Sequence, residues 1–175
     1  MRSAIATFDA GFSRFIAFLA VLVAASIGLM AILIPLNLFL IKFGLGSMWW
    51  LYEAVEYGLF VGVFIGAPWV LRQGAHVRVD VLVTALPAHL AVHLERVIDV
   101  AGVALCLLLC FYGLRATIVE FNDGTLPDKD LRIANWYMTG TFAFSFFILA
   151  VEFLLRIGRA SRLVDVAKRT SKAGF

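Results

Sequence analysis

The sequence predicts an all-α integral membrane protein with four transmembrane helices. Hydrophobic residues make up 62% of the 175-residue chain and charged residues only 15%, whereas soluble domains are about half apolar and a quarter charged. The apolar runs are long and continuous, so the alternating pattern of an outer-membrane β-barrel is missing. Composition and pattern together therefore favour membrane-spanning helices.

Four apolar runs are predicted to cross the bilayer, which requires about 20 residues per helix. They cover approximately residues 15–41, 49–71, 97–114 and 136–155. The first run is too long for the apolar core of a signal peptide, so we expect it to be retained. No repeat or linker divides the sequence, and we expect a single four-helix membrane domain over residues 1–175.

The basic residues predict the orientation of these helices. Eleven of the 15 Lys and Arg residues lie before the first run, between the second and third, or after the fourth, and four lie on the opposite side. Cytoplasmic loops carry the excess of basic residues, so both termini and the central loop are predicted to be cytoplasmic. The net charge of +3 is then an orientation signal, and we expect no nucleic-acid partner.

The central loop, residues 74–95, is half apolar. An isolated strand at a membrane would leave its edges unpaired, so we predict a short amphipathic segment of one or two helices in the membrane interface. Asp80 is a candidate cap for the first helix. Pro87 is predicted to separate it from a second helix that leads into the third run.

The middle of each run lacks acidic and basic side chains, as the windows 24–32, 59–65, 102–109 and 143–149 show. A carrier of anions or protons normally places charge, or the free ends of broken helices, near this depth. Cys106 and Cys110 lie in an apolar run and are interpreted as small buried hydrophobic residues. The sequence thus favours a scaffold over a carrier.

Charged residues enter the runs only near their ends. Glu53 and Glu56 lie at one end of the second run, and Arg115 lies at the same side of the third. We predict a structural Glu56–Arg115 ion pair; the alternative is a proton or sodium site at Glu53 or Glu56.

Two further acidic residues lie toward the other side of the membrane. Asp99 and Glu152 occur near the ends of the third and fourth runs. They are expected at depths that three arginines can reach, namely Arg14, Arg72 and Arg96.

The sequence contains no complete metal-binding or catalytic motif. His89 and His93 are four residues apart and share a helix face, with His76 nearby in sequence. This spacing suits zinc, but no third ligand is evident, and haem between facing spans is disfavoured because all three histidines lie in the central loop. The chain also lacks G-x-S-x-G, H-E-x-x-H and a phosphate-binding glycine loop. We therefore predict neither an enzyme nor a bound metal or other cofactor.

Small residues mark one face of each of the first two runs. Such faces allow membrane helices to approach closely and gain dispersion contacts. In an antiparallel hairpin we predict three matched contacts: Gly66 with Ala20, Gly62 with Ala24, and Gly58 with Gly28. The alternative turns the glycine face toward a helix of a partner protein.

The sequence resembles the small membrane subunit (DctQ-type small permease) of tripartite ATP-independent periplasmic, or TRAP, transporters. The resemblance rests on a set of residues between positions 53 and 87, and on a second motif in the third run. These are Glu53, Tyr57, Gly66-Ala67, Arg72, Gly74, His76, Val77, Val79-Asp80, Leu86-Pro87 and Phe111-Tyr112-Gly113. Many members have prolines near the entrance to the last span, where this chain has Ile133-Ala134-Asn135-Trp136.

The resemblance implies sodium-driven uptake of organic acids by symport across the bacterial inner membrane. A periplasmic substrate-binding protein (DctP-type) would capture the substrate, and a large membrane subunit (DctM-type) would hold the substrate and sodium sites. The small subunit would brace the static part of that carrier and would need no cofactor of its own.

Two surfaces are candidate interfaces within this picture. The connection 120–132 would face the periplasmic binding protein or remain a solvated loop, and its acidic residues are Glu120, Asp123, Asp128 and Asp130. The segment 72–80 would set the depth of the subunit at the cytoplasmic surface. Its polar residues, Arg72, His76, Arg78 and Asp80, would contact the large subunit or anionic lipid head groups.

Two other functions remain open from the sequence. One is a stand-alone four-span carrier or channel, which would have to rely on Ser26, Ser145 and the backbone at mid-depth. The other is a redox membrane anchor for quinone or haem. The transported substrate is not specified by this chain, because selectivity is expected in the other two components.

Overall fold

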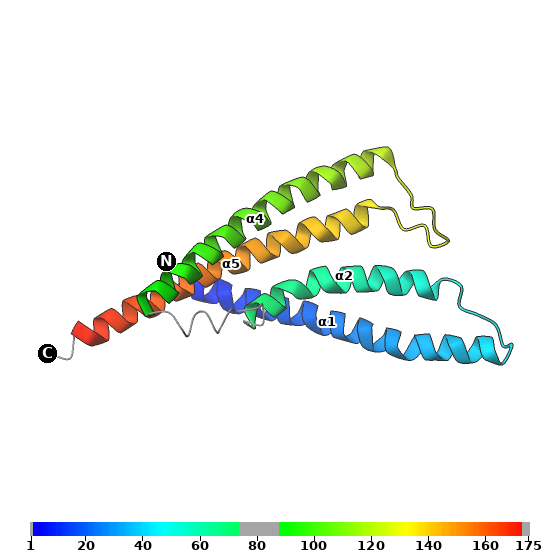
Figure 1. Cartoon of the computed structure of the whole chain (residues 1–175), viewed down its shortest axis with the longest axis horizontal. Helices are drawn as coiled ribbons and strands as arrows, with labels where there is room; N and C mark the ends of the chain where they lie inside the picture. The colour runs from blue at the N-terminus through cyan, green and yellow to red at the C-terminus, as the bar shows by residue number, and fades with distance from the viewer. Residues whose placement is uncertain (1, 74–87, 173–175) are drawn as a thin grey trace.

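The structure, a computed structural model, describes residues 2–73 and 88–172. This part of the chain is all-helical, with no strand, as predicted. Its helices are α1 (Arg2–Lys42), α2 (Leu51–Arg72), α4 (Ala88–Asp123) and α5 (Trp136–Lys172) (Figure 1).

Each helix contains a segment that is long and apolar enough to cross a membrane. These segments are Thr7–Lys42, Leu51–Arg72, Arg96–Asp123 and Trp136–Arg159. They include almost all of the predicted runs and extend most of them, because helical backbone continues through the polar residues at the ends of the apolar windows. The prediction of four membrane helices is therefore confirmed.

The predicted interfacial segment falls mainly on residues 74–87, which lie outside the described residues. Its last part, residues 88–95, belongs to α4, which begins directly after Pro87 and runs without a break into the third span. A proline fixes its own φ and disfavours helix in the residue before it, so a helix that begins just after Pro87 is the expected arrangement.

The helices are arranged as two antiparallel hairpins, α1–α2 and α4–α5, and α2 packs against α5 to join them. The order across the molecule is thus α1, α2, α5, α4. The start of α1 and the end of α5 lie at one end of the molecule, here called the terminal end, together with the end of α2 and the start of α4 (Figure 1). The connections 43–50 and 124–135 lie at the opposite loop end, toward which the two hairpins diverge.

The densest packing lies between α4 and α5. A Cβ atom on Gly102 would lie 2.8 Å from the ring of Phe153, and a Cβ atom on Gly113 would lie 2.9 Å from the Phe142 ring and 3.2 Å from the Ala143 Cα. Only glycine fits at such distances, and its use lets two membrane helices gain close backbone contact. Neither glycine was predicted from the sequence to have a packing role.

The α1–α2 hairpin forms as predicted, but its residue-by-residue pairing was wrong. Gly58 lies against the side chain of Met30, and Gly62 and Gly66 both lie nearest to Val23. A Cβ atom on Gly28 would have no neighbour within 4 Å. The predicted partners failed because the larger side chains of α1, Val23 and Met30, reach the glycines of α2 and keep the small residues of α1 at a distance.

Candidate functional site

Four charged side chains from three helices meet at the terminal end: Asp9 of α1, Arg72 of α2, and Glu152 and Arg159 of α5. We call them the terminal charge cluster. The Arg72 guanidinium lies 2.8 Å from the Asp9 carboxylate and 3.0 Å from that of Glu152. The Arg159 guanidinium lies 3.0 Å from Asp9 and 2.9 Å from Glu152. Each arginine therefore pairs with both carboxylates.

These ion pairs matter for stability because one of the carboxylates, that of Glu152, is buried. The Glu152 side chain is only 1% exposed, and a buried carboxylate without partners is strongly destabilising. Arg72 and Arg159 compensate it from two helices. A second pair, Arg156 with the buried Asp99 at 3.2 Å, joins α5 to α4. The terminal end is thus held together by ion pairs that involve all four helices.

The sequence analysis predicted part of this arrangement. Arg72 does reach Glu152, and Asp99 pairs with Arg156, which was not among the arginines proposed for it. Asp9 and Arg159 were missed. A signal for Arg159 was present, because positions 152, 156 and 159 follow the spacing that places residues on one helix face. Asp9 had no comparable signal.

At the loop end, α2 holds the connection 124–135. The Glu53 carboxylate accepts hydrogen bonds from the backbone N–H groups of Asp130 at 3.1 Å and Leu131 at 2.5 Å. Lys129 pairs with Glu56 at 2.7 Å and lies 5.0 Å from the centre of the Tyr57 ring. The hydrogen bond to the Glu56 carboxylate raises the pKa of Lys129 above its usual value. These contacts fold the connection back over the start of α2.

The predicted Glu56–Arg115 ion pair was wrong, because Glu56 pairs with Lys129 instead. Arg115 is exposed on α4 and forms no ion pair within residues 2–73 and 88–172. The prediction compared helix positions alone and did not foresee that the connection returns to α2. A lysine on a folded-back loop then reaches Glu56 more directly than an arginine on a separate helix.

The four acidic residues proposed for docking differ in their surroundings. Glu120 accepts a hydrogen bond from the Thr139 hydroxyl at 2.8 Å, which joins α4 to α5. Asp123, Asp128 and Asp130 are exposed. Of the four proposed residues, these three present exposed carboxylates at the loop end.

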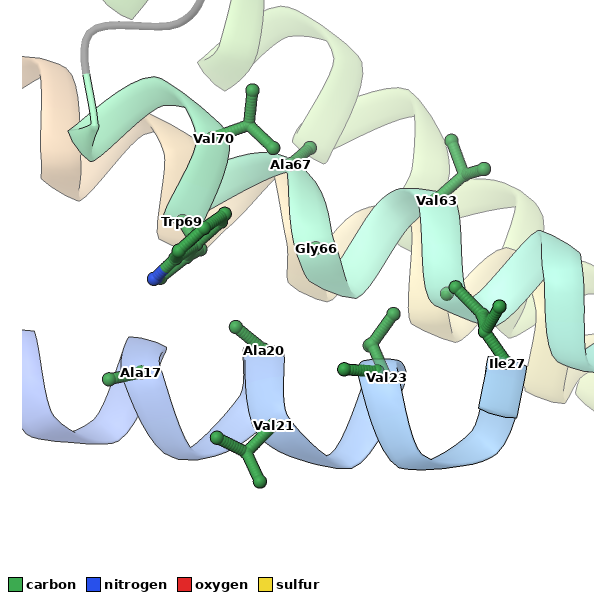
Figure 2. Close-up of a pocket in the computed structure, with 12 residues that line it drawn as sticks. Ala17, Ala20, Val21, Val23, Ile27, Val63, Gly66, Ala67, Trp69 and Val70 are labelled. Atoms are coloured by element: carbon green, nitrogen blue, oxygen red, sulfur yellow. The ribbon is translucent and has the colours of Figure 1, made fainter. Parts of the chain in front are cut away.

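A groove of about 710 Å³ separates α1 from α2 on the terminal half of the hairpin (Figure 2). Ala20 and Val23 point from α1 toward α2, and Trp69 points from α2 toward α1. The predicted small residues Ala20, Ala24, Gly62 and Gly66 all line the groove, so they leave space where the prediction expected contact. The lining contains no acidic or basic side chain.

Between the two ends, the described helices hold no acidic or basic side chain in the four mid-depth windows. The buried polar side chain there is Ser145, whose hydroxyl donates to the Phe64 carbonyl and so joins α5 to α2. Asn37 is also buried, nearer the loop end, and its side-chain oxygen accepts the Met48 N–H at 2.8 Å. No cluster of His, Cys, Asp or Glu suited to a metal ion occurs among the residues that the structure describes. His76, Arg78 and Asp80 lie outside them.

These features define a class of protein. It is a multi-pass helical membrane protein whose helices are connected by polar contacts at both ends and are apolar between the ends. Comparison with known protein families identifies the family within this class. The family model described as "Tripartite ATP-independent periplasmic transporters, DctQ component" matches residues 30–163. This match covers most of the chain, which therefore belongs to the DctQ family of TRAP transporter components and confirms the resemblance found in the sequence. No curated protein matches the chain.

Proposed function

We propose that this protein is the small, bracing subunit of a TRAP transporter that takes up an organic acid across the bacterial inner membrane. The observation that carries the proposal is the apolar interior of the described helices between two polar ends. A group that transfers an anion or a cation across the hydrocarbon region needs polar partners at mid-depth. Substrate and sodium would therefore be bound by the large membrane subunit.

The ion pairs and hydrogen bonds at the two ends of the molecule support a bracing role. The terminal charge cluster and the Asp99–Arg156 pair connect four helices at one end. Glu53 and Glu56 fix the connection 124–135 at the other. Breaking buried pairs is costly, so the helices resist separation. Such resistance suits a subunit that stays fixed while a neighbouring carrier changes shape.

The orientation in this proposal places the terminal end in the cytoplasm and the loop end in the periplasm. It rests on the excess of basic residues at the terminal end and on the positive-inside rule. The segment 72–80 would then lie at the cytoplasmic surface. It would contact the large subunit or anionic lipid head groups.

Docking of the periplasmic binding protein would use the loop end. Asp123, Asp128 and Asp130 are exposed there, and Glu53 holds the backbone at residues 130 and 131. An anchored acidic loop gives a partner with basic side chains a defined surface and steers its approach. Glu120 would support this loop through Thr139 and would not itself contact the partner.

Co-purification and reconstitution together test the proposal. The chain is tagged, expressed with its chromosomal neighbours and purified in mild detergent, and a large multi-span protein is expected to accompany it. Vesicles are then loaded with this chain alone, with chain and large subunit, or with both and the periplasmic protein. Uptake of labelled succinate, sialic acid and gluconate is measured with an inward sodium gradient.

Uptake is expected only when all three proteins are present, and only for the labelled acid that the periplasmic protein binds. Accumulation of any of these acids by the chain alone would contradict the proposal and favour a stand-alone carrier. Purification of the chain as a coloured protein without a large partner would favour a redox anchor.

A further inference from the structure

Arg115 is a basic residue on the outer side of the helix row. It lies on α4, on the face opposite α5, and is exposed. It forms no ion pair within the described part of the chain, now that Glu56 is seen to pair with Lys129. Basic residues inside membrane spans are rare, and they usually pair with another group.

The depth of Arg115 can be placed from its neighbours. Phe121 lies six residues later on α4, and its ring packs edge-on against Trp136 with centroids 5.6 Å apart. Trp and Tyr residues concentrate at the membrane–water interface, so Trp136 and the adjacent Tyr137 mark that level at the loop end. At 1.5 Å per residue, Arg115 lies about 9 Å further into the membrane.

The direction of α4 makes it unfavourable for the Arg115 side chain to extend to the membrane surface at the loop end. Long basic side chains near helix ends commonly extend to the interface. However, the Cα–Cβ bond in a helix tilts toward the helix N-terminus, and the N-terminus of α4 lies at the terminal end (Figure 1). The side chain of Arg115 therefore starts out toward the membrane interior, away from the nearer surface.

The surface around Arg115 has the shape of a helix-packing face. Six exposed residues recur at intervals of four and three: Ala101, Leu105, Leu108, Tyr112, Arg115 and Val119. We call this row the outward seam of α4. Such spacing keeps one face aligned with a second helix, and the row spans about 27 Å, close to the hydrocarbon thickness of about 30 Å. A hollow of about 420 Å³ lies beside Arg115.

The other edge of the row differs in charge. α1 also exposes large apolar residues, among them Leu22 and Ile32, but residues 15–41 include no acidic or basic side chain. An all-apolar face is suited to lipid tails. A face with one unpaired arginine is complementary to a protein helix that carries a carboxylate.

We propose that the outward seam of α4 is the surface that docks the large membrane subunit, and that Arg115 pairs there with an Asp or Glu side chain on one of that subunit's transmembrane helices. The inference rests on the proposed function, which supplies the large subunit as the partner. Arg115 recognises the partner and sets the register of the two helices. α1, at the opposite edge, faces lipid.

The test combines site-specific cross-linking with substitution in the co-expressed complex. A photoreactive benzoylphenylalanine is placed at Leu108 or Val119 of the outward seam, and at Leu22 or Ile32 of α1 as matched positions. After irradiation in membranes, the seam positions are expected to cross-link to the large subunit, and the α1 positions to lipid.

Substitution tests the charge itself. Arg115→Leu is expected to weaken binding of the large subunit in nanodiscs about tenfold, since a polar pair between membrane helices contributes about that much. Arg115→Lys should retain most of the affinity and Arg115→Glu should lose more. The matched control is Arg132→Leu, which removes an exposed arginine of the loop end and should leave affinity unchanged. The melting temperature of the isolated chain should not fall with Arg115→Leu.

The outcomes separate the inference from the function on which it rests. If the wild-type chain binds the large subunit but cross-links to it only from α1, or if Arg115→Leu keeps full affinity, the docking face is wrong and the function stands. If the wild-type chain binds no large subunit at all, the proposed function fails and the inference fails with it.

Discussion

The two hairpins use glycine for different purposes. In α4–α5, Gly102 and Gly113 lie where any side chain would collide with Phe153, Phe142 or Ala143. In α1–α2, a Cβ atom on Gly62 would meet only Val23 at 3.4 Å, an ordinary contact distance, and an apolar groove lies beside it. One hairpin is tightly packed at its glycines, and the other leaves space beside Gly62 and Gly66, although Gly58 lies against Met30.

This difference shows that a glycine-rich face does not by itself predict close packing. The glycines of α2 are more numerous and more regularly spaced than those of α4, yet α4 packs more tightly. The opposing surface decides the packing: α5 presents rings that fit around Gly102 and Gly113, whereas α1 presents to Gly62 and Gly66 only Val23, at ordinary contact distances. The α4–α5 hairpin is therefore expected to be the rigid half, and α1–α2 the adjustable half.

The largest expected effect concerns the joint between the hairpins. Glu152→Gln removes the buried charge that Arg72 and Arg159 both contact. Loss of one partner of a buried ion pair costs about 3 kcal/mol or more, so the free energy of unfolding in mixed micelles should fall by about that amount. The same exchange at the exposed pair, Glu56→Gln, is the control and should change it by less than about 1 kcal/mol. Equal losses would show that the terminal charge cluster does not join the hairpins.

The next effect tests the tight hairpin. Gly113→Leu would force a side chain against Phe142 and the Ala143 backbone, and overpacking of this kind costs about 2 kcal/mol. Gly28→Leu is the matched control, because a Cβ atom there has no neighbour within 4 Å, and it should change stability by less than about 0.5 kcal/mol. Thermal unfolding of the purified variants measures both. A stable Gly113→Leu protein would contradict the rigid packing of α4 on α5.

The smallest effect tests the loose hairpin. Gly62→Leu adds a side chain at the edge of the α1–α2 groove, which has room for it. The expected loss in unfolding free energy is therefore about 1 kcal/mol or less, below that of the identical exchange at Gly113. If Gly62→Leu proves as damaging as Gly113→Leu, the two hairpins do not differ in packing.

The sequence predicted the spans well because each depends on a local property. A window of apolar residues of sufficient length is helical in a membrane whatever its neighbours are. The apolar mid-depth could be predicted for the same reason. The family could also be predicted, since the motif residues from Glu53 to Pro87 lie close together in the sequence.

The contacts between helices were harder to predict. Whether Asp99 of α4 meets Arg156 of α5 depends on how far α4 is rotated about its own axis, and side-chain spacing in one helix does not specify that angle. The same uncertainty led to the wrong partners for Gly58 and Gly28. The contacts of Glu53 left no trace in the sequence, because its partners are backbone N–H groups that nearly every residue possesses.

The arrangement of the helices in a row, α1, α2, α5 and α4, has a consequence for transport that is purely geometrical. A row of rods has two broad sides and no inside, so tilting or sliding these four helices encloses no passage for a solute. Under the proposed function, the route through the membrane would be built by the neighbouring large subunit. The row can offer a wall of helices, and under the docking proposed above Arg115 on its α4 edge would fix where the neighbour attaches.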